Sequence, residues 1–254
     1  MKKLIWLIIL FPILFAGVEF DGADDSISIP DDNSIDIGTS DFTLAAWIKS
    51  DNIANYKIIF DKPASTGNAP KYQMMLNTNG RLCFYLDDGT GSVLSTDDGT
   101  VIDDAASHHV AVTFDRDGNA IRYVDGSPDG IADDISGVQL TLTNDGALYI
   151  GTRLLSADRF FLGNINEIAV WNILLTANEI SLLANSRIKR IPLQIQPNNL
   201  VLYLPMDDEP DGSSADGDSF MDKSGNGNNG TGSDGANNTG CTAKAEEVLS
   251  YPGD

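Results

Sequence analysis

The sequence 108-HHVAVTFDRDGNAIRYVDG-126 decides the fold class, because it has the pattern of two β-strands joined by a tight turn. Within residues 109–114, Val110, Val112 and Phe114 occupy alternate positions, so all three point to one face of a strand. The Asp-Gly-Asn turn at 117–119 comes where a hairpin requires it. We therefore predict that the two apolar runs are antiparallel neighbours.

Short apolar runs separated by Gly, Asp and Asn continue on both sides of this hairpin, from residue 18 to residue 170. The clearest strand-like runs are residues 42–48, 72–76, 81–86, 109–114, 120–124, 148–150 and 165–171. Helical periodicity is almost absent, except that the capping box at 176–179 (TANE) precedes Ile180, Leu182 and Leu183 and predicts a short helix ending near Asn185. The pattern is typical of an all-β antiparallel sandwich.

Length and charge limit the classes of function. The 254 residues suffice for one large sandwich with a smaller remainder, and the formal net charge is −21. Such a surface repels phosphate backbones and anionic membranes, which excludes nucleic acid as a favourable partner. Acidity of this degree suits calcium, neutral glycans or salty surroundings.

The N-terminus has the pattern of a signal peptide over residues 1–17. Lys2 and Lys3 form its basic part and residues 4–15 its apolar part, with cleavage expected near Ala16 or Gly17. An uncleaved anchor is the alternative, but the apolar run is shorter than the ~20 residues that span a bilayer. We expect a secreted or cell-surface protein without membrane insertion after leader removal.

Four motifs, in order, give the sequence a family resemblance: residues 18–27 (VEFDGADDSI), 41–49 (DFTLAAWIK), 108–115 with 123–126, and 161–172 (FLGNINEIAVWN). They resemble the laminin-G-like group of the concanavalin A-like lectin and glucanase superfamily. The resemblance covers residues 18–185 and implies a jelly-roll β-sandwich of two curved antiparallel sheets. Two departures are Ser107, where the family usually has an aromatic residue, and Asn166, where it usually has Asp.

We divide the chain after the predicted signal peptide into a sandwich over residues 18–190 and an acidic Gly/Asn-rich segment over 191–254. Residues 200–206 are strand-like, whereas 207–240 have few apolar residues and predict loop unless something ties them down. Two interpretations stay open. The segment begins a truncated second repeat, or residues 200–206 fold back and supply the opening strand that the first domain lacks.

Catalytic carboxylates are not predicted. Glucanases of the superfamily use carboxylates two and four residues apart on one strand, because that spacing places them on one face beside the glycosidic bond. Asp115 and Asp117 have the separation but fall in the turn. We therefore expect no enzyme, and a glycoside hydrolase or lyase remains an alternative through superfamily analogy.

Calcium is the cofactor that the sequence favours. Asp21 and Asp24 flank a Gly-permitted bend that offers carboxylate oxygens, and the resemblance adds Asn166 as an amide ligand. A secondary acidic loop carries Asp125, Asp129 and Asp133 at calcium-loop spacing, but it lacks the terminal carboxylate. The alternative for this loop is a solvated acidic turn.

Aromatic, histidine and cysteine residues complete the candidates. Trp47, Trp171, Phe20, Phe42 and Phe114 are expected in the core, and the candidates for stacking on sugars are Tyr72, Tyr85 and Tyr123. His108 and His109 should point to opposite faces, one packed and one near the surface, and so cannot share a metal. Cys83 is expected as a core residue, and a Cys83–Cys241 disulfide stays open.

These observations lead us to expect a secreted, non-catalytic recognition module. Its partner would be a glycan or an extracellular protein, and calcium would have a structural role. Besides the hydrolase or lyase, a structural or adhesive repeat without a small ligand is the remaining alternative.

Overall fold

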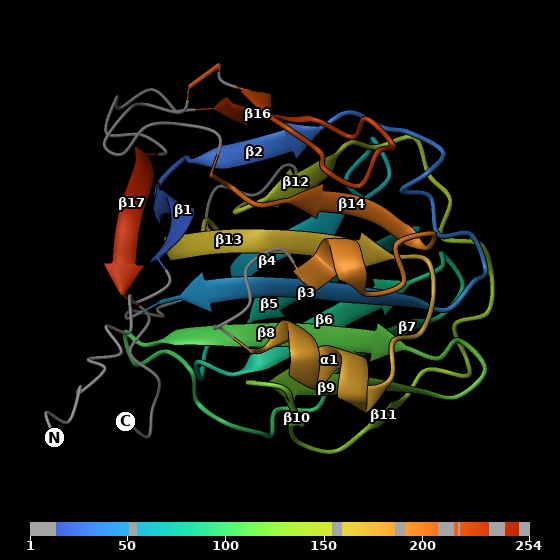
Figure 1. Cartoon of the computed structure of the whole chain (residues 1–254). Helices are drawn as coiled ribbons and strands as arrows, with labels where there is room; N and C mark the ends of the chain where they lie inside the picture. Colours follow the sequence, from blue (N-terminus) through green and yellow to red (C-terminus); the bar gives the residue numbers. More distant parts are fainter. Residues whose placement is uncertain are drawn as a thin grey trace, which may run out of the picture.

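The computed structural model describes residues 14–50, 55–153, 159–185, 191–207, 216–217, 219–233 and 242–248 (Figure 1). Two antiparallel sheets face each other as a sandwich, and one α-helix lies on its outside within these residues. The predicted all-β jelly roll with one short helix is therefore confirmed.

The first sheet contains the predicted hairpin. Its order is β10 (Ser127–Pro128), β9 (Asn119–Val124), β8 (Ser107–Phe114), β3 (Phe42–Lys49), β13 (Leu162–Trp171), β1 (Leu14–Asp21) and β17 (Thr242–Val248). Two further strands pair with members of this row, β11 (Asp133–Asp134) with β9 and β14 (Leu200–Leu204) with β13. Antiparallel pairing of β8 with β9 around the turn confirms the hairpin.

The second sheet has the order β15 (Ser219–Phe220), β16 (Gly230–Ser233), β2 (Ser26–Ile29), β12 (Leu148–Ile150), β4 (Lys57–Lys62), β5 (Lys71–Leu76), β6 (Leu82–Asp87) and β7 (Ser92–Leu94). The middle strands come from distant parts of the chain, since β12 lies between β2 and β4. The β4–β5–β6–β7 end is built from consecutive hairpins.

The core lies between the sheets and is filled by alternate residues of their strands. Phe42 stacks on Phe114 with ring centroids 4.2 Å apart, and Phe84 of the opposite sheet meets Phe114 edge-on at 5.2 Å. Val110 and Val112 join the same core. The one-face prediction for this strand is confirmed, because Ala111, between the valines, belongs to a separate cluster on the other side of the sheet.

That second cluster covers the outer face of the first sheet. Helix α1 (Ala177–Leu183) and the 3-10 helix η1 (Ile191–Gln194) cross this face, and Figure 1 shows α1 in front of β8 and β9. Ile180 and Leu183 of α1 pack in a cluster with Trp171, whose Nε1 donates to the carbonyl of Ile195 (2.8 Å). The capping box begins the helix as predicted.

The segment after residue 190 joins both sheets. Strand β14 pairs with the Ile168–Trp171 half of β13, while β1 pairs with the Leu162–Ile165 half, so the two strands share one side of β13. Strand β16 extends the second sheet by pairing with β2. The carboxylate of Asp222 fastens the loop between β15 and β16 to β14, because its Oδ1 accepts the backbone N–H of Tyr203 (2.9 Å). The described parts of this segment are thus integral to the sandwich.

Some sequence predictions lie outside the described residues. Residues 1–13 of the predicted signal peptide are among those not described, and β1 begins at Leu14. Cys241, the possible disulfide partner of Cys83, also lies outside the described residues, and Cys83 is buried in β6. In the part of the chain that the structure describes, no helix has the length and apolar character needed to cross a membrane.

Candidate functional site

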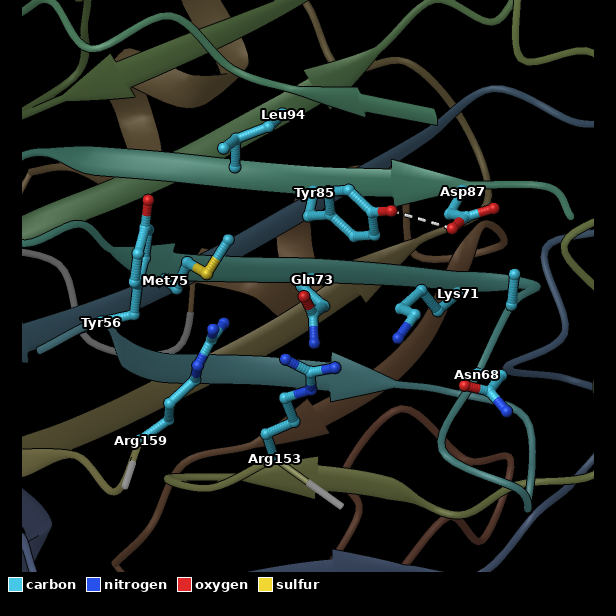
Figure 2. Close-up of a pocket in the computed structure, with 11 residues that line it drawn as sticks. Tyr56, Asn68, Lys71, Gln73, Met75, Tyr85, Asp87, Leu94, Arg153 and Arg159 are labelled. Carbon is cyan, nitrogen blue, oxygen red and sulfur yellow. Dashed lines mark hydrogen bonds between the residues drawn. The ribbon is translucent and has the colours of Figure 1, made fainter. Parts of the chain in front are cut away.

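A pocket of about 400 Å³ opens on the outer face of the second sheet, over strands β4, β5 and β6 (Figure 2). It is lined by Tyr56, Asn68, Ala69, Lys71, Gln73, Met75, Tyr85, Asp87, Leu94, Arg153 and Arg159. Strand alternation brings these side chains together, because Lys71, Gln73 and Met75 point away from the core that Tyr72 and Met74 enter.

The floor of the pocket combines a polar and an apolar part. Gln73 is buried and donates from Nε2 to Oδ1 of the fully buried Asp61 (2.6 Å). Beside it, Met75 packs with Ile58 and Cys83 in a small apolar cluster. Burial raises the pKa of the Cys83 thiol to about 11, so this cysteine is protonated near neutral pH and behaves as a packing residue.

Two half-buried tyrosines form the walls, and a cation lies over each ring. Lys71 Nζ is 5.9 Å from the ring centre of Tyr85, and the guanidinium carbon of Arg159 is 5.0 Å from that of Tyr56. The Tyr85 hydroxyl donates to Oδ2 of Asp87 (2.9 Å), which orients the ring. In Figure 2 the tyrosines stand apart, with Met75 and Gln73 on the strand between them.

The arginines come from the loop that follows β12. Arg159 is fixed at the edge of β4, because its carbonyl accepts the backbone N–H of Ile58 (3.4 Å). In Figure 2 the side chains of Arg153 and Arg159 both extend toward the floor, Arg153 toward Gln73. The loop thereby brings two cations over a sheet face that is otherwise formed by β4 to β6.

The pocket is net positive, whereas the protein as a whole is strongly negative. Three lining residues are cationic and one is a carboxylate, whereas the chain has 16 Lys and Arg against 37 Asp and Glu. Burial lowers the pKa of Lys71, and the positive charge of Arg153 adds to this, against the opposing charges of Asp61 and Asp87. The site is therefore a polar, cation-bearing pocket with aromatic walls.

The predicted calcium ligands are only partly brought together. Carboxylate oxygens of Asp21, Asp24 and Asp25 lie within 4.8 Å of one another. Asn166 is not beside them, because Asp21 pairs with Leu162 and four residues along β13 correspond to about 13 Å. The missed residue is Asp25, which is fully buried and accepts the backbone N–H of Asp21 (2.7 Å). Three carboxylates on one turn are a donor set that suits calcium.

The secondary acidic loop does not converge. Asp125 Oδ2 lies 2.9 Å from Nδ1 of His108, while Asp129 and Asp133 accept backbone and hydroxyl hydrogen bonds from two threonines in the loop after β7. Among the described residues these three carboxylates form no group with metal-ligand spacing. Asp125 thus binds His108, whereas Asp129 and Asp133 bind two different threonines of one loop, and the three carboxylates do not share a site.

The three tyrosines predicted as sugar-stacking candidates lie in three different environments. Tyr72 is buried in the core and donates its hydroxyl to the carbonyl of Ile35 (3.0 Å), and burial raises its pKa. Tyr123 lies beneath α1 in the outer cluster. Tyr85 alone lines the pocket, where sequence reasoning missed Tyr56, Arg153 and other members. The two arginines belong to a loop without periodicity, so no sequence pattern indicated them.

The histidine prediction is half wrong. The two rings do not share a site, but both side chains are buried, with 5% and 2% exposure for His108 and His109. His108 lies between Asp125 (2.9 Å) and Asp104 (3.1 Å). These two carboxylates cover the ring that was expected near the surface.

The catalytic reading finds no support at Asp115 and Asp117. They form the β8–β9 turn, in which the backbone N–H of Asp117 donates to Oδ1 of Asp115 (3.3 Å). Of the carboxylates near the pocket, Asp61 is bound to Gln73 and Asp87 to Tyr85.

A family model of the concanavalin A-like lectin/glucanases superfamily, of the laminin G type, matches residues 21–181, which include the whole pocket. This chain belongs to the concanavalin A-like lectin/glucanase superfamily. The resemblance of the four sequence motifs to the laminin-G-like group is thereby confirmed.

Solved structures share the superfamily fold at low sequence identity. A candidate carbohydrate-binding protein from Bacteroides ovatus is 21% identical, with a TM-score of 0.63, over 94% of this chain and 61% of that protein. A pentraxin from Limulus polyphemus, similar to serum amyloid P component, is 18% identical (TM-score 0.51) over 67% of this chain and 82% of its own. The binding domain of Paraclostridial Mosquitocidal Protein 1 is 14% identical (TM-score 0.50) over 68% and 52%. The chain thus spans about three fifths of the Bacteroides protein.

Proposed function

We propose that this superfamily member is a non-catalytic recognition module that binds a glycan in the pocket over β4, β5 and β6. One observation carries the proposal. The outer face of the first sheet is covered by α1 and η1, whereas the outer face of the second sheet has a pocket with two half-buried tyrosines.

The chemistry of the lining suits a sugar. Aromatic faces such as those of Tyr56 and Tyr85 pack against the C–H groups of a pyranose, while hydroxyl groups need directional polar partners. Hydrogen-bond donors and acceptors come from Asn68, from Asp87 and from the three cationic side chains of the lining. A volume of about 400 Å³ falls in the range of small-molecule sites.

The comparisons support the proposal at the level of the fold. The Bacteroides protein is described as a candidate carbohydrate-binding protein, and its similarity extends over 94% of this chain. Because identity is 21%, the ligand class is argued from the pocket itself.

The test is binding of the chain without residues 1–17 to a glycan array, followed by titration calorimetry on the hits. Tyr85→Ala should weaken binding by about tenfold or more, since it removes one wall. The matched control is Tyr149→Ala. Tyr149 is a half-buried tyrosine on β12 of the same sheet and is not a lining residue. Equal affinities for the two variants, or release of new reducing ends from a bound glycan, would contradict a non-catalytic site in this pocket.

We also propose a structural calcium at Asp21, Asp24 and Asp25. Its support is the convergence of the three carboxylates on one turn. Calcium should raise the melting temperature and a chelator reverse the rise, whereas Asp24→Asn should abolish the response. Asp32→Asn is the control, because it neutralises an exposed carboxylate elsewhere. A melting temperature indifferent to calcium would refute this site.

Secretion to the cell exterior or surface completes the proposal, on the basis of the leader-like residues 1–17. Mass spectrometry of the protein recovered after export should find a mature N-terminus near Ala16 to Val18. An intact residue 1 on exported, unanchored protein would contradict cleavage.

A further inference from the structure

We propose that the pocket selects an acidic saccharide, a sugar unit bearing a carboxylate or sulfate that the cations Lys71, Arg153 and Arg159 bind. This inference rests on the proposed glycan-binding function and specifies its ligand class. The observation behind it is the local reversal of charge, three cations and one carboxylate, in a strongly acidic protein.

Arg153 is the cation with the most free binding capacity. It has no hydrogen-bond or ion-pair partner among the described residues, although it extends over the buried amide of Gln73 in Figure 2. A guanidinium offers a planar fork of N–H donors that matches the two oxygens of a carboxylate or sulfate. An oxyanion seated there would supply the missing acceptor.

Lys71 faces the same space with donors to spare. Its Nζ donates to the carbonyl of Gly67 (3.0 Å), and an ammonium group has three donors. Arg153 and Arg159 both lower the pKa of Lys71, so the three cations are close enough to repel one another. A bound anion would offset this repulsion together with the desolvation of Lys71.

The aromatic walls distinguish a saccharide from a bare anion. Tyr85 beneath Lys71 and Tyr56 beneath Arg159 place an apolar surface next to each cation. A sugar acid has this combination, with C–H groups on the ring and a charged substituent beside them. A free inorganic anion would leave both rings unused.

The experiment compares affinities for matched pairs of probes in about 150 mM salt, which is close to physiological ionic strength. The pairs are oligogalacturonate, oligomannuronate and oligoglucuronate with their methyl esters, and a sulfated galactan with its desulfated form. At least one acidic member should bind about tenfold or more tightly than its neutral counterpart. Carboxylate and sulfate sources are distinguished by which pairs show the preference.

Charge variants connect the preference to the pocket. Arg153→Gln should reduce the preference toward unity, with an unchanged melting temperature as the check on folding. Arg81→Gln is the matched control, since it removes one positive charge from a surface ion pair with Asp97 (3.1 Å) outside the pocket. Its affinity for the acidic probe should change less than about twofold.

The outcomes separate the inference from the proposed function. Tyr85-dependent binding of neutral glycans without an acidic preference would overturn the inference and keep the glycan site. An acidic preference that Arg153→Gln and Arg81→Gln reduce equally would also overturn it. Failure of every probe to bind would refute both.

Discussion

The ring of His109 meets the indole of Trp47 edge-on, with centroids 5.5 Å apart and planes inclined by 70°. Its Nδ1 atom has no hydrogen-bond partner among the described residues, and burial lowers its pKa to about 4 despite the opposing charge of Asp125. The adjacent His108 lies between two carboxylates. Burial opposes its protonation, but Asp125 and Asp104 outweigh that effect and raise its pKa. The pKa values of these two neighbouring histidines are therefore shifted in opposite directions.

His109 should make the fold sensitive to mild acid. The pKa of His109 in the folded protein is lowered from 6.5 to about 4. Between these two pH values the imidazole is therefore protonated in the unfolded chain but neutral in the folded protein. The free energy of unfolding should fall by about 3 kcal/mol over this window through His109. Urea unfolding at several pH values should show a flatter profile for His109→Phe.

His108 provides the opposite control. Its raised pKa gives stability that is complete below the unfolded value and is lost as pH rises through the folded one. His108→Gln should therefore steepen the loss of stability on acidification. A flatter acid profile for this variant would contradict the assignment of the two environments.

Arg122 should be essential for stability, because it organises the acidic loops at one edge. It is buried, and Nη1 donates to the carbonyls of Thr96 (3.1 Å) and Asp98 (3.0 Å), while Nη2 contacts the Asp98 carboxylate. Arg122→Met should lower the free energy of unfolding by about 3–5 kcal/mol, since it leaves these acceptors unpaired. Arg81→Met, on an exposed ion pair, should cost less than about 1 kcal/mol by the same denaturant measurement.

The fold-back strand should unfold together with the rest. Leu202 of β14 is fully buried in the main core, so Leu202→Ala should cost about 2–5 kcal/mol. Leu193→Ala in η1, at a position with 37% exposure, should have a smaller effect. A single denaturation transition in both variants is expected, and a separate early transition in Leu202→Ala would mean that β14 is an independent unit.

The capping box of α1 should contribute a small, reciprocal stabilisation. Thr176 Oγ1 accepts the backbone N–H of Glu179 (3.3 Å), and Glu179 Oε2 accepts that of Thr176 (2.8 Å). Thr176→Ala should lower the free energy of unfolding by about 1 kcal/mol. The double variant with Glu179→Ala should cost less than the sum of the single changes, because each side chain caps the other.

Several strands were predictable because their pattern is local. The run at 148–150 coincides with β12, and those at 42–48 and 120–124 match β3 and β9 to within a residue. Strand β4 was missed, because its charged residues hide the pattern. Lys62 at its end is buried, and its Nζ contacts Asp31 (2.8 Å), Asp36 (3.3 Å) and Oδ1 of Asn144 (2.8 Å), which are all distant in sequence.

The candidate site was less predictable than the fold. Tyr85 was named and lines the pocket, but Tyr72 and Tyr123 have the same residue type and are buried. Which face of a strand meets solvent depends on what covers the sheet, and α1 covers Tyr123. Likewise Asp25 completes the acidic turn that the sequence predicted through Asp21 and Asp24, whereas the register of β13 removes Asn166.

The sequence by itself determined several of the strands, the β8–β9 hairpin turn and the capped helix, because alternation, turn chemistry and capping act between residues a few positions apart. Tertiary structure alone decided that β14 and β16 join the sheets, that one outer face is covered and that Arg153 and Arg159 lie over β5. These features depend on pairing and packing between residues tens of positions apart. Local pattern carries no information about such partners, since the free energy that selects them comes from burial and hydrogen bonding in the assembled sandwich.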